Sequence, residues 1–459
     1  MIRLAGKVRP GTAWPMVWAL VALLVLSQSA ASAATVTNAW QAKIGSAGVN
    51  GTAKIVALDA GSGSITLKLA KLKPNAYVPV TLSKGTCGSV GSTLIKFPTV
   101  KTSRSGTAAR TSALSASQVA LIKNATKGSA RIAIRVGSST TGGVKCGLFT
   151  ALAVPPYVAA TISVGLFPSG VEIAPNGVWT VNAADRTLSR IDPATNGVLQ
   201  TLPLEISGGS APWSVAYGEN SLWMTVVSFD ANGNSLPGGL VRFDPTAGVQ
   251  QASITLGRSP SGVVVSPGAA WVSLYDENAV VRVDSATNTV AATIPVARGP
   301  NAVAFGFGSV WVSSDDGHLS RIDPATNQVT ATVATQDTGG WVAVSATAVW
   351  VTNPGHEGTP DGMLTRIDPA TNQITASLTV GSWAGPVAVA GGSVWVALID
   401  TPTLVQVSEA TNSIANRITL RYPAIDLAAD SHNVWVVERM ELPDSGTALP
   451  VSFVARVAY

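Results

Sequence analysis

Residues 308–327 read GSVWVSSDDGHLSRIDPATN, and this stretch contains the two phrases that predict the fold. A tryptophan in the same apolar setting as Trp311 recurs through the last two-thirds of the chain. The tryptophans are Trp179, Trp223, Trp271, Trp311, Trp350, Trp395 and Trp435. Their separations of 44, 48, 40, 39, 45 and 40 residues match the length of a β-propeller blade, about 40–50 residues. The spacing therefore predicts a propeller of seven blades.

The letters around Trp311 also predict the four strands of one blade. The strands are expected at 300–305, 308–313, 319–323 and 329–333. In the turn before the last strand, Asp323 can accept backbone hydrogen bonds, Pro324 presets φ, and Asn327 tolerates a left-handed conformation. Because this phrase returns in other blades, we assign its aspartates a structural role rather than a metal-binding one. The tryptophans are expected to pack between blades rather than to form a ligand-stacking ring.

The two ends of the propeller predict how the ring closes. Residues 158–165, VAATISVG, match the outer strand 290–296, VAATIPV. The last residues, 451–459, are in the register of a third strand, so the last blade lacks an outer strand and the first segment has one to spare. We therefore expect an all-β chain: a small antiparallel β-sandwich over 34–155, then a seven-bladed β-propeller over 156–459, closed by its N-terminal outer strand.

The repeat resembles a known family. Its Val-Trp-Val and Arg-Ile-Asp-Pro-Ala-Thr-Asn phrases are similar to the YVTN-type β-propeller repeat, and to the related streptogramin-lyase propellers, over about residues 159–459. The resemblance implies the fold, because the shared letters are scaffold letters. Streptogramin lyases use histidines and a glutamate around a divalent ion, so the resemblance also implies a candidate catalytic set, His318, His356 and Glu357.

The first 33 residues have the pattern of a signal peptide. Arg3, Lys7 and Arg9 precede an almost unbroken apolar run over 16–26, and Ala-Ser-Ala at 31–33 supplies the small residues of a cleavage site. The run is too short to span a bilayer, and no second apolar span follows. We therefore expect an exported protein, periplasmic or extracellular, without a transmembrane segment after cleavage.

Charge divides the remaining chain at the stiff dipeptide Pro155-Pro156. Residues 34–155 carry 15 Lys and Arg against one acid, Asp59, whereas 156–459 carry 12 Arg, no Lys and 24 acids. Three interpretations of the basic surface stay open: a solvated face, docking against the acidic propeller, and attraction to an external polyanion such as a cell-envelope polymer. Nucleic acid is disfavoured as a partner because aromatic residues for base stacking are sparse.

The basic segment is expected to form antiparallel strands, because apolar and polar residues alternate in 65–70 and 131–136. Ser115 and Gln118 form a capping-box pattern before the one candidate helix. Cys87 and Cys146 are expected to form a disulfide in an oxidising compartment. The order of turns and the cysteine pair resemble the copper/zinc superoxide dismutase-like sandwich. The segment has no histidine for that family's metal site, so the resemblance implies a fold and not the activity.

Candidate ligand-binding residues lie in the loops expected around one mouth of the propeller channel. Arg258, Arg298 and Arg421 each stand two residues before a proline, and Phe167 and Trp383 fall near the same level in other blades. Arginines and aromatic side chains around one entrance can hold an anionic or sugar-like ligand.

A separate candidate cation site is Asp230, Asn232 and Asn234, which match the first three oxygen ligands of an EF-hand loop. No cofactor is predicted, although a divalent ion, calcium or magnesium, is the candidate ligand there and at the histidine set. We expect a monomeric, non-enzymatic binding protein whose partner is a protein, a glycan or a cell-envelope polyanion. The alternative is a metal-assisted lyase or hydrolase of the streptogramin-lyase or lactonase kind.

Overall fold

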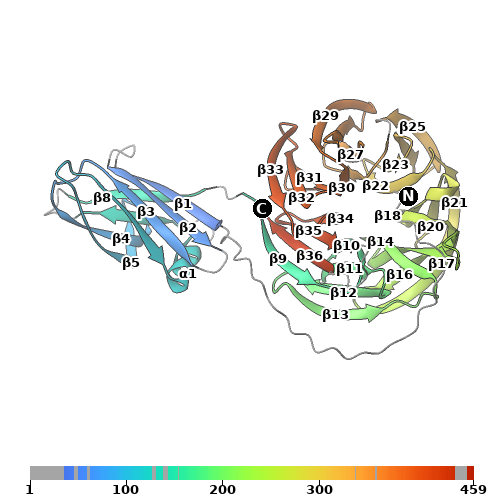
Figure 1. The fold of residues 1–459 in the computed structure, drawn as a ribbon, viewed down its shortest axis with the longest axis horizontal. Helices are drawn as coiled ribbons and strands as arrows, with labels where there is room; N and C mark the ends of the chain where they lie inside the picture. Colours follow the sequence, from blue (N-terminus) through green and yellow to red (C-terminus); the bar gives the residue numbers. More distant parts are fainter. Residues whose placement is uncertain are drawn as a thin grey trace. The chain divides into compact units, whose positions relative to one another are not determined.

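The structure is a computed structural model, and it describes residues 36–45, 50–58, 62–126, 131–137, 143–152, 155–335, 338–356, 359–439 and 452–459. The chain divides into two compact units between Tyr157 and Val158, and each has its own core (Figure 1). The predicted signal peptide lies outside the described residues. Among the helices of the described residues, none has both the length and the apolar character that a bilayer span requires.

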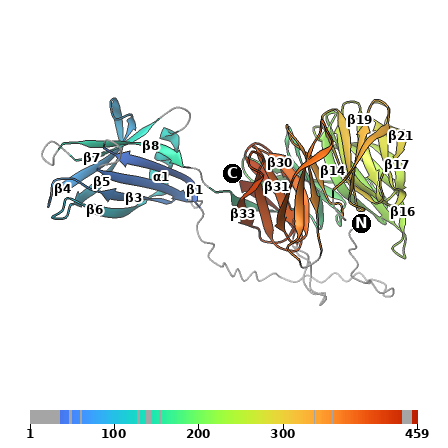
Figure 2. The same ribbon diagram turned by 90° about the horizontal axis from the view of Figure 1, so that it is seen from above.

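The N-terminal unit is a nearly closed, eight-stranded antiparallel sheet around one core. Its elements are β1 (Val36–Ile44), β2 (Gly51–Leu58), β3 (Gly63–Leu69), β4 (Tyr77–Gly85), β5 (Val90–Lys101), β6 (Ala108–Leu114), α1 (Ala116–Ala125), β7 (Ile132–Val136) and β8 (Lys145–Leu152). They pair in the order β5-β4-β7-β8-β1-β2-β3-β6. β8 pairs with β7 through its first half and with β1 through its second half, so this strand joins the two layers of the predicted sandwich. Figure 2 shows these strands turned by 90°.

Two local predictions for this unit are confirmed. The Ser115 hydroxyl accepts a hydrogen bond from Gln118 N at 3.3 Å, and Gln118 Oε1 accepts one from Ser115 N at 2.9 Å, so the capping box starts α1. Cys87 and Cys146 form a disulfide with their Cα atoms 5.7 Å apart, and it ties the β4–β5 loop to β8.

The second unit is a ring of seven four-stranded antiparallel blades. From the innermost strand outward, the blades are β10 (Pro168–Ala174), β11 (Gly177–Asn182), β12 (Thr187–Asp192) and β13 (Gly197–Pro203); β14 (Ser210–Gly218), β15 (Ser221–Phe229), β16 (Ser235–Asp244) and β17 (Val249–Arg258); β18 (Pro260–Ser266), β19 (Ala269–Leu274), β20 (Ala279–Asp284) and β21 (Thr289–Pro295); β22 (Pro300–Gly306), β23 (Ser309–Ser314), β24 (His318–Asp323) and β25 (Gln328–Ala334); β26 (Val342–Val344), β27 (Val349–Asn353), β28 (Gly362–Asp368) and β29 (Gln373–Gly381); β30 (Ala384–Ala390), β31 (Ser393–Leu398), β32 (Thr403–Ser408) and β33 (Ser413–Thr419); and β34 (Ala424–Ala429), β35 (Asn433–Arg439), β36 (Ser452–Ala458) and β9 (Tyr157–Ser163). A short 3₁₀ helix, η3 (Tyr275–Glu277), lies between β19 and β20. The seventh blade takes β9 as its outer strand, which confirms the predicted closure.

The tryptophans of the repeat pack between blades, as predicted. All seven are at most 2% exposed. An arginine from the third strand of the same blade lies over most of these rings; the distance from Cζ to the ring centroid is 4.8 Å for Arg242 over Trp223 and 4.9 Å for Arg321 over Trp311. Each such cation–π contact adds to the burial of the ring in the inter-blade core.

The same arginines explain why the Arg–Asn phrase repeats. Arg321 Nη1 donates to Asn372 Oδ1 at 3.1 Å, and Asn372 ends the turn of the next blade. Three further pairs repeat this link, Arg242–Asn288, Arg366–Asn412 and Arg456–Asn196. The sixth blade has Gln406 in place of the arginine. The seventh blade has no turn between its third and outer strands, because these strands, β36 and β9, come from opposite ends of the propeller sequence. The phrase therefore specifies contacts between blades.

Candidate functional site

The connections from each outer strand to the next innermost strand surround one end of the channel, which we call the loop-bearing mouth. In most blades the residue before the innermost strand has a positive φ, which is 53° at Phe167, 50° at Ser259 and 46° at Trp383. Its carbonyl oxygen accepts a hydrogen bond from the residue that follows the second strand of the same blade. Bulky side chains rarely adopt this conformation, and such strain concentrates at binding sites. Phe167 and Trp383 are thus aromatic side chains in strained positions.

Acidic side chains in the connections between the second and third strands of a blade hold these loops in place. Glu277 Oε1 accepts a hydrogen bond from Arg258 N at 2.7 Å, and Asp316 Oδ2 accepts one from Arg298 N at 3.0 Å. These carboxylates therefore hold the backbone of the arginines rather than their side chains. Arg258 and Arg298 are exposed, and within the described ranges neither guanidinium forms an ion pair with a carboxylate.

Arg421 has different surroundings from the other two arginines. The innermost strand after it begins its pairing at Ala424, three residues on, whereas Pro260 and Pro300 begin theirs two residues after Arg258 and Arg298. The proline spacing in the sequence therefore does not place the three at one level. The Arg421 guanidinium lies 5.4 Å from the ring centroid of Tyr422 and 4.9 Å from that of Phe453. These two rings are stacked with centroids 6.0 Å apart.

Exposed apolar side chains gather where the first two blades and the last blade meet. Leu166, Phe167 and Trp213 are 37%, 38% and 38% exposed, and Trp213 lies in a bulge near the start of β14. The β9–β10 connection and the start of β10 contact both neighbouring blades: Ser169 Oγ of β10 donates to Pro212 O at 3.1 Å, and Phe167 N of the connection donates to Ser452 Oγ at 3.2 Å. We call Leu166, Phe167, Trp213, Arg421 and Tyr422 the aromatic sector.

The sequence reasoning missed Trp213, although a signal was present. This tryptophan stands ten residues before the repeat tryptophan Trp223 and has no counterpart in most blades. A large side chain outside the repeat is not required by blade packing. At a β-bulge, where a strand redirects its side chains, it is a functional candidate.

Hydroxyl groups link the innermost strands around part of the channel. Two residues after its repeat tryptophan, each of four consecutive blades has a serine or threonine whose hydroxyl donates to a carbonyl in, or just before, the innermost strand of the next blade. These bonds are Thr225 to Ser261 O at 2.9 Å, Ser273 to Asn301 O at 2.8 Å, Ser313 to Gly340 O at 2.6 Å and Thr352 to Gly385 O at 2.8 Å. The corresponding residues of the other blades are Ala397, Val437 and Val181.

In the sector that lacks these hydroxyls, two carboxyl groups of the innermost strands link neighbouring blades by accepting backbone hydrogen bonds. Asp426 Oδ2 accepts a hydrogen bond from Val171 N of the next blade at 2.8 Å, and Glu172 accepts one from Tyr217 N of the blade after that. Burial raises the pKa of Asp426 from 3.8 to about 7 and that of Glu172 from 4.5 to about 7. The charge of Asp426 also raises the pKa of Glu172.

These pKa values predict how propeller stability depends on pH. Between about pH 4 and 7 the folded state binds more protons at Asp426 and Glu172 than the unfolded chain does, so this contribution to stability falls as pH rises through that window. We expect the Tm of the propeller to be lower at pH 8 than at pH 5.5, and Asp426→Asn with Glu172→Gln to flatten this dependence. Asp323→Asn is the control, because the pKa of Asp323 is lowered by its turn hydrogen bonds. An unchanged slope in the double variant would contradict the assignment.

The histidine set is dispersed over separate loops. His318 Nδ1 lies 3.1 Å from Asp316 Oδ1, and His356 Nδ1 lies 2.7 Å from Asp361 Oδ2, so each histidine contacts an aspartate of its own loop. Glu357, the third member, lies outside the described residues. Across the described ranges, no three His, Cys, Asp or Glu side chains are placed to hold a metal ion.

The EF-hand-like segment closes on itself. Asp230 Oδ1 accepts hydrogen bonds from Asn232 N and Asn234 N, both at 2.8 Å, and Asp230 Oδ2 accepts one from Asn234 Nδ2 at 2.8 Å. These hydrogen bonds lower the pKa of Asp230. The loop is a complete polar turn in this form, and calcium binding to it stays a prediction.

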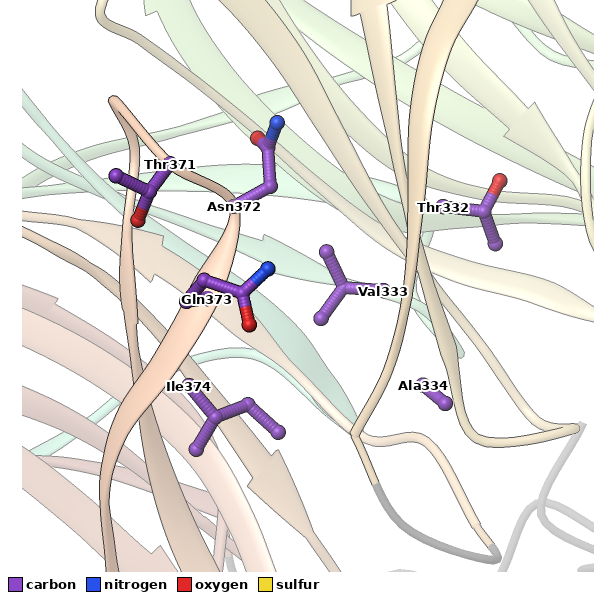
Figure 3. Close-up of a pocket in the computed structure, with 7 residues that line it drawn as sticks. All are labelled: Thr332, Val333, Ala334, Thr371, Asn372, Gln373 and Ile374. Carbon is purple, nitrogen blue, oxygen red and sulfur yellow. The ribbon is translucent and has the colours of Figure 1, made fainter.

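A groove of about 530 Å³ lies away from all of these residues, on the outer side of the ring between the fourth and fifth blades (Figure 3). It is lined by Thr332, Val333 and Ala334 of β25 and by residues 371–374 of the next blade. In Figure 3, Val333 lies in the space between the two strands and Gln373 faces it. No predicted candidate residue lines the groove.

Comparison with known proteins supports the fold. No protein-family model matches the chain, and no curated protein matches it. Among solved structures, the chain is similar to hydrazine synthase of Kuenenia stuttgartiensis, with a TM-score of 0.51 and 14% identity over 60% of this chain and 94% of that chain. At this identity the likeness concerns the fold alone, and the resemblance to the YVTN-type repeat stays a prediction.

Proposed function

We propose that this is an exported, non-enzymatic binding protein whose propeller holds a carbohydrate at the aromatic sector of the loop-bearing mouth. The observation that carries the proposal is the exposure of Phe167 and Trp213 on adjoining blades, each at 38%. A buried repeat core already satisfies the packing of the blades, so exposed aromatic side chains at the channel entrance are surplus to folding. The disulfide and the signal-peptide pattern support export.

A sugar fits the chemistry of this sector better than a purely apolar ligand does. Aromatic faces pack against the apolar faces of sugar rings, while polar groups at the edge bond hydroxyls and fix orientation. Arg421 supplies five N–H donors beside Tyr422, and its aromatic stack restricts its motion. Other blades present Trp383, Arg258 and Arg298 at the same mouth. These side chains are suited to contact further sugar units of a longer oligosaccharide.

A metal-assisted lyase or hydrolase is the alternative function. Such an enzyme needs at least three ligands that converge on one ion, with an open position for water or substrate. His318 and His356 instead contact aspartates of their own loops. We therefore favour binding. Loss of a hydrolytic or lyase activity on the bound glycan after metal chelation would favour the alternative.

Trp213→Ala and Phe167→Ala are expected to weaken binding of the tightest oligosaccharide found on a glycan array by at least about tenfold each, as for other aromatic anchors. Calorimetry with that oligosaccharide measures the change. Phe307→Ala is a matched control, because Phe307 is 42% exposed with a φ of 52° but lies in the β22–β23 turn at the opposite mouth. Equal effects at Phe307 and Trp213, or no effect at Trp213 and Phe167, would contradict the proposed site.

A further inference from the structure

The outer face of the β1-β2-β3-β6 layer in the N-terminal unit carries lysine and threonine side chains in register. One row across the strands is Lys43, Thr52, Lys68 and Ala109, and the next is Thr150, Gln41, Lys54, Thr66 and Thr111. We call the lysines, threonines and Gln41 of these rows the lysine–threonine face. Lys43, Lys54 and Lys68 are exposed, and the residues between them along each strand point into the core.

Within the described residues of this unit, no carboxylate is available to neutralise the face. The described residues between 36 and 157 contain no Asp or Glu, and Asp59 lies outside them. Ordinary protein surfaces mix both signs of charge, which limits repulsion within the surface. Adjacent strands are about 4.8 Å apart, so the backbones at Lys43 and Lys68, two strands apart in one row, are about 10 Å apart, and the two like charges belong to the same face. Such an arrangement is favourable when an anionic partner covers it.

The threonines and Gln41 indicate what else the partner carries. Thr66 Oγ1 and Thr111 Oγ1 lie 3.1 Å apart, and Thr150 Oγ1 donates to Gln41 O at 3.2 Å, so hydroxyl groups lie on both sides of Lys54 in its row. Hydroxyls both donate and accept hydrogen bonds, which suits a partner that does the same. A polymer of acidic sugars offers carboxylates for the lysines and hydroxyls for the threonines.

Aromatic side chains that would stack on nucleic-acid bases are absent from this face. Trp40 and Phe149 are buried in the core at 5% and 6% exposure. Tyr77, exposed at 62%, belongs to the other layer, where Lys101 Nζ lies 5.6 Å from its ring centroid. Binding of single-stranded nucleic acid relies on stacking as well as charge, so the face is poorly suited to it.

The opposite outer face also carries cations. Arg135 pairs with Thr81 and Thr81 with Lys96, all on the outer side of the β7-β4-β5 layer. Because the two outer faces lie on opposite sides of one core, docking against the propeller can cover only one of them. A separate, polymeric partner then accounts for the face that such docking would leave open.

We infer that the lysine–threonine face of the N-terminal unit binds an acidic polysaccharide, through Lys43, Lys54 and Lys68 and the threonines between them. This site lies in a different unit from the proposed glycan site at the propeller mouth, so either can fail without the other. The contact is chiefly electrostatic, and it weakens as salt shortens the screening length from about 10 Å at 0.1 M to about 3 Å at 1 M.

The test uses the full chain with Trp213→Ala and Phe167→Ala already present, so that binding at the mouth does not contribute. In this background, Lys43→Gln/Lys54→Gln/Lys68→Gln is compared with Lys96→Gln/Lys101→Gln/Arg135→Gln, which removes the same charge from the opposite face. The probe is polygalacturonate, titrated by calorimetry in low and high salt. We expect the first triple variant to weaken polygalacturonate binding at least about tenfold and the second to weaken it less than about threefold. High salt is expected to weaken binding to the protein whose lysine–threonine face is unmutated.

Four outcomes would overturn the inference. Equal losses in the two triple variants would mean that net charge alone attracts the polymer. Equal affinity for fully methyl-esterified and unesterified polygalacturonate would mean that the protein does not recognise the carboxylates. Tighter binding of polyphosphate or single-stranded DNA would identify another class of partner. Absence of binding, together with a radius of gyration that grows with salt in scattering, would show that the lysines dock on the propeller instead.

Discussion

Deleting residues 158–165 is expected to lower the Tm of the propeller by about 10 °C or more, whereas deleting the N-terminal unit, residues 36–155, leaves it nearly unchanged. The reason is that β9 completes the blade formed by β34, β35 and β36. Ile162 of β9 is 6% exposed and packs in the same cluster as Trp435 and Val454. Without β9 this cluster opens to water and β36 becomes an unpaired edge. Differential scanning calorimetry of the two deletion variants measures the effect.

A single substitution tests whether the packing of β9 in the seventh blade stabilises the ring, without removing the strand. Ile162→Ala removes the buried side chain and is expected to cost about 2–5 kcal/mol of unfolding free energy. Ile374→Ala is the matched control, since Ile374 also lies on an outer strand but is 42% exposed. If the two deletions gave equal Tm values, or Ile162→Ala cost no more than Ile374→Ala, closure by β9 would not be what stabilises the ring.

The parts of this fold that could be predicted from sequence are those that the chain repeats. Trp311 and Asp323 have counterparts in other blades, so period and turn chemistry together placed the strands of the fourth blade within two residues of β22 to β25. Closure followed from the match of 158–165 to an outer strand. The link from Arg321 to Asn372 was not foreseen, because it joins residues of different repeats, and a repeat pattern does not say which copies touch.

The site was less predictable because it consists of departures from the repeat. Counting residues to the next proline grouped Arg421 with Arg258 and Arg298. The innermost strand after Arg421 begins its pairing one residue later than the other two do, and Arg421 stacks on Tyr422 instead. The channel carboxyls, Asp426 and Glu172, replace hydroxyl links that only the register of the innermost strands reveals. Side chains that depart from the repeat are identified by their neighbours in the folded structure rather than by their spacing in the sequence.

The second large effect concerns the disulfide. Replacing both cysteines, Cys87→Ser with Cys146→Ser, is expected to destabilise the N-terminal unit by about 4 kcal/mol, the loss for a closed loop of this length in the chain-entropy account. The bond joins residues 59 apart and connects the β4–β5 loop to β8, the strand that holds the two layers together. For a unit of this size the change corresponds to a fall in Tm of roughly 20 °C.

The propeller serves as an internal control in the same experiment, because both cysteines of the chain lie in the other unit. Calorimetry of the double variant should therefore show one transition moved and the other unchanged, and a reducing agent should move the same transition in the unmodified chain. The buried core of the N-terminal unit, with Ile55, Ile65 and Ile134 at 1% exposure or less, remains in the variant, so we expect a folded but less stable unit. A shift of both transitions would mean that the two units unfold together; no shift would mean that the core alone determines the stability of the N-terminal unit.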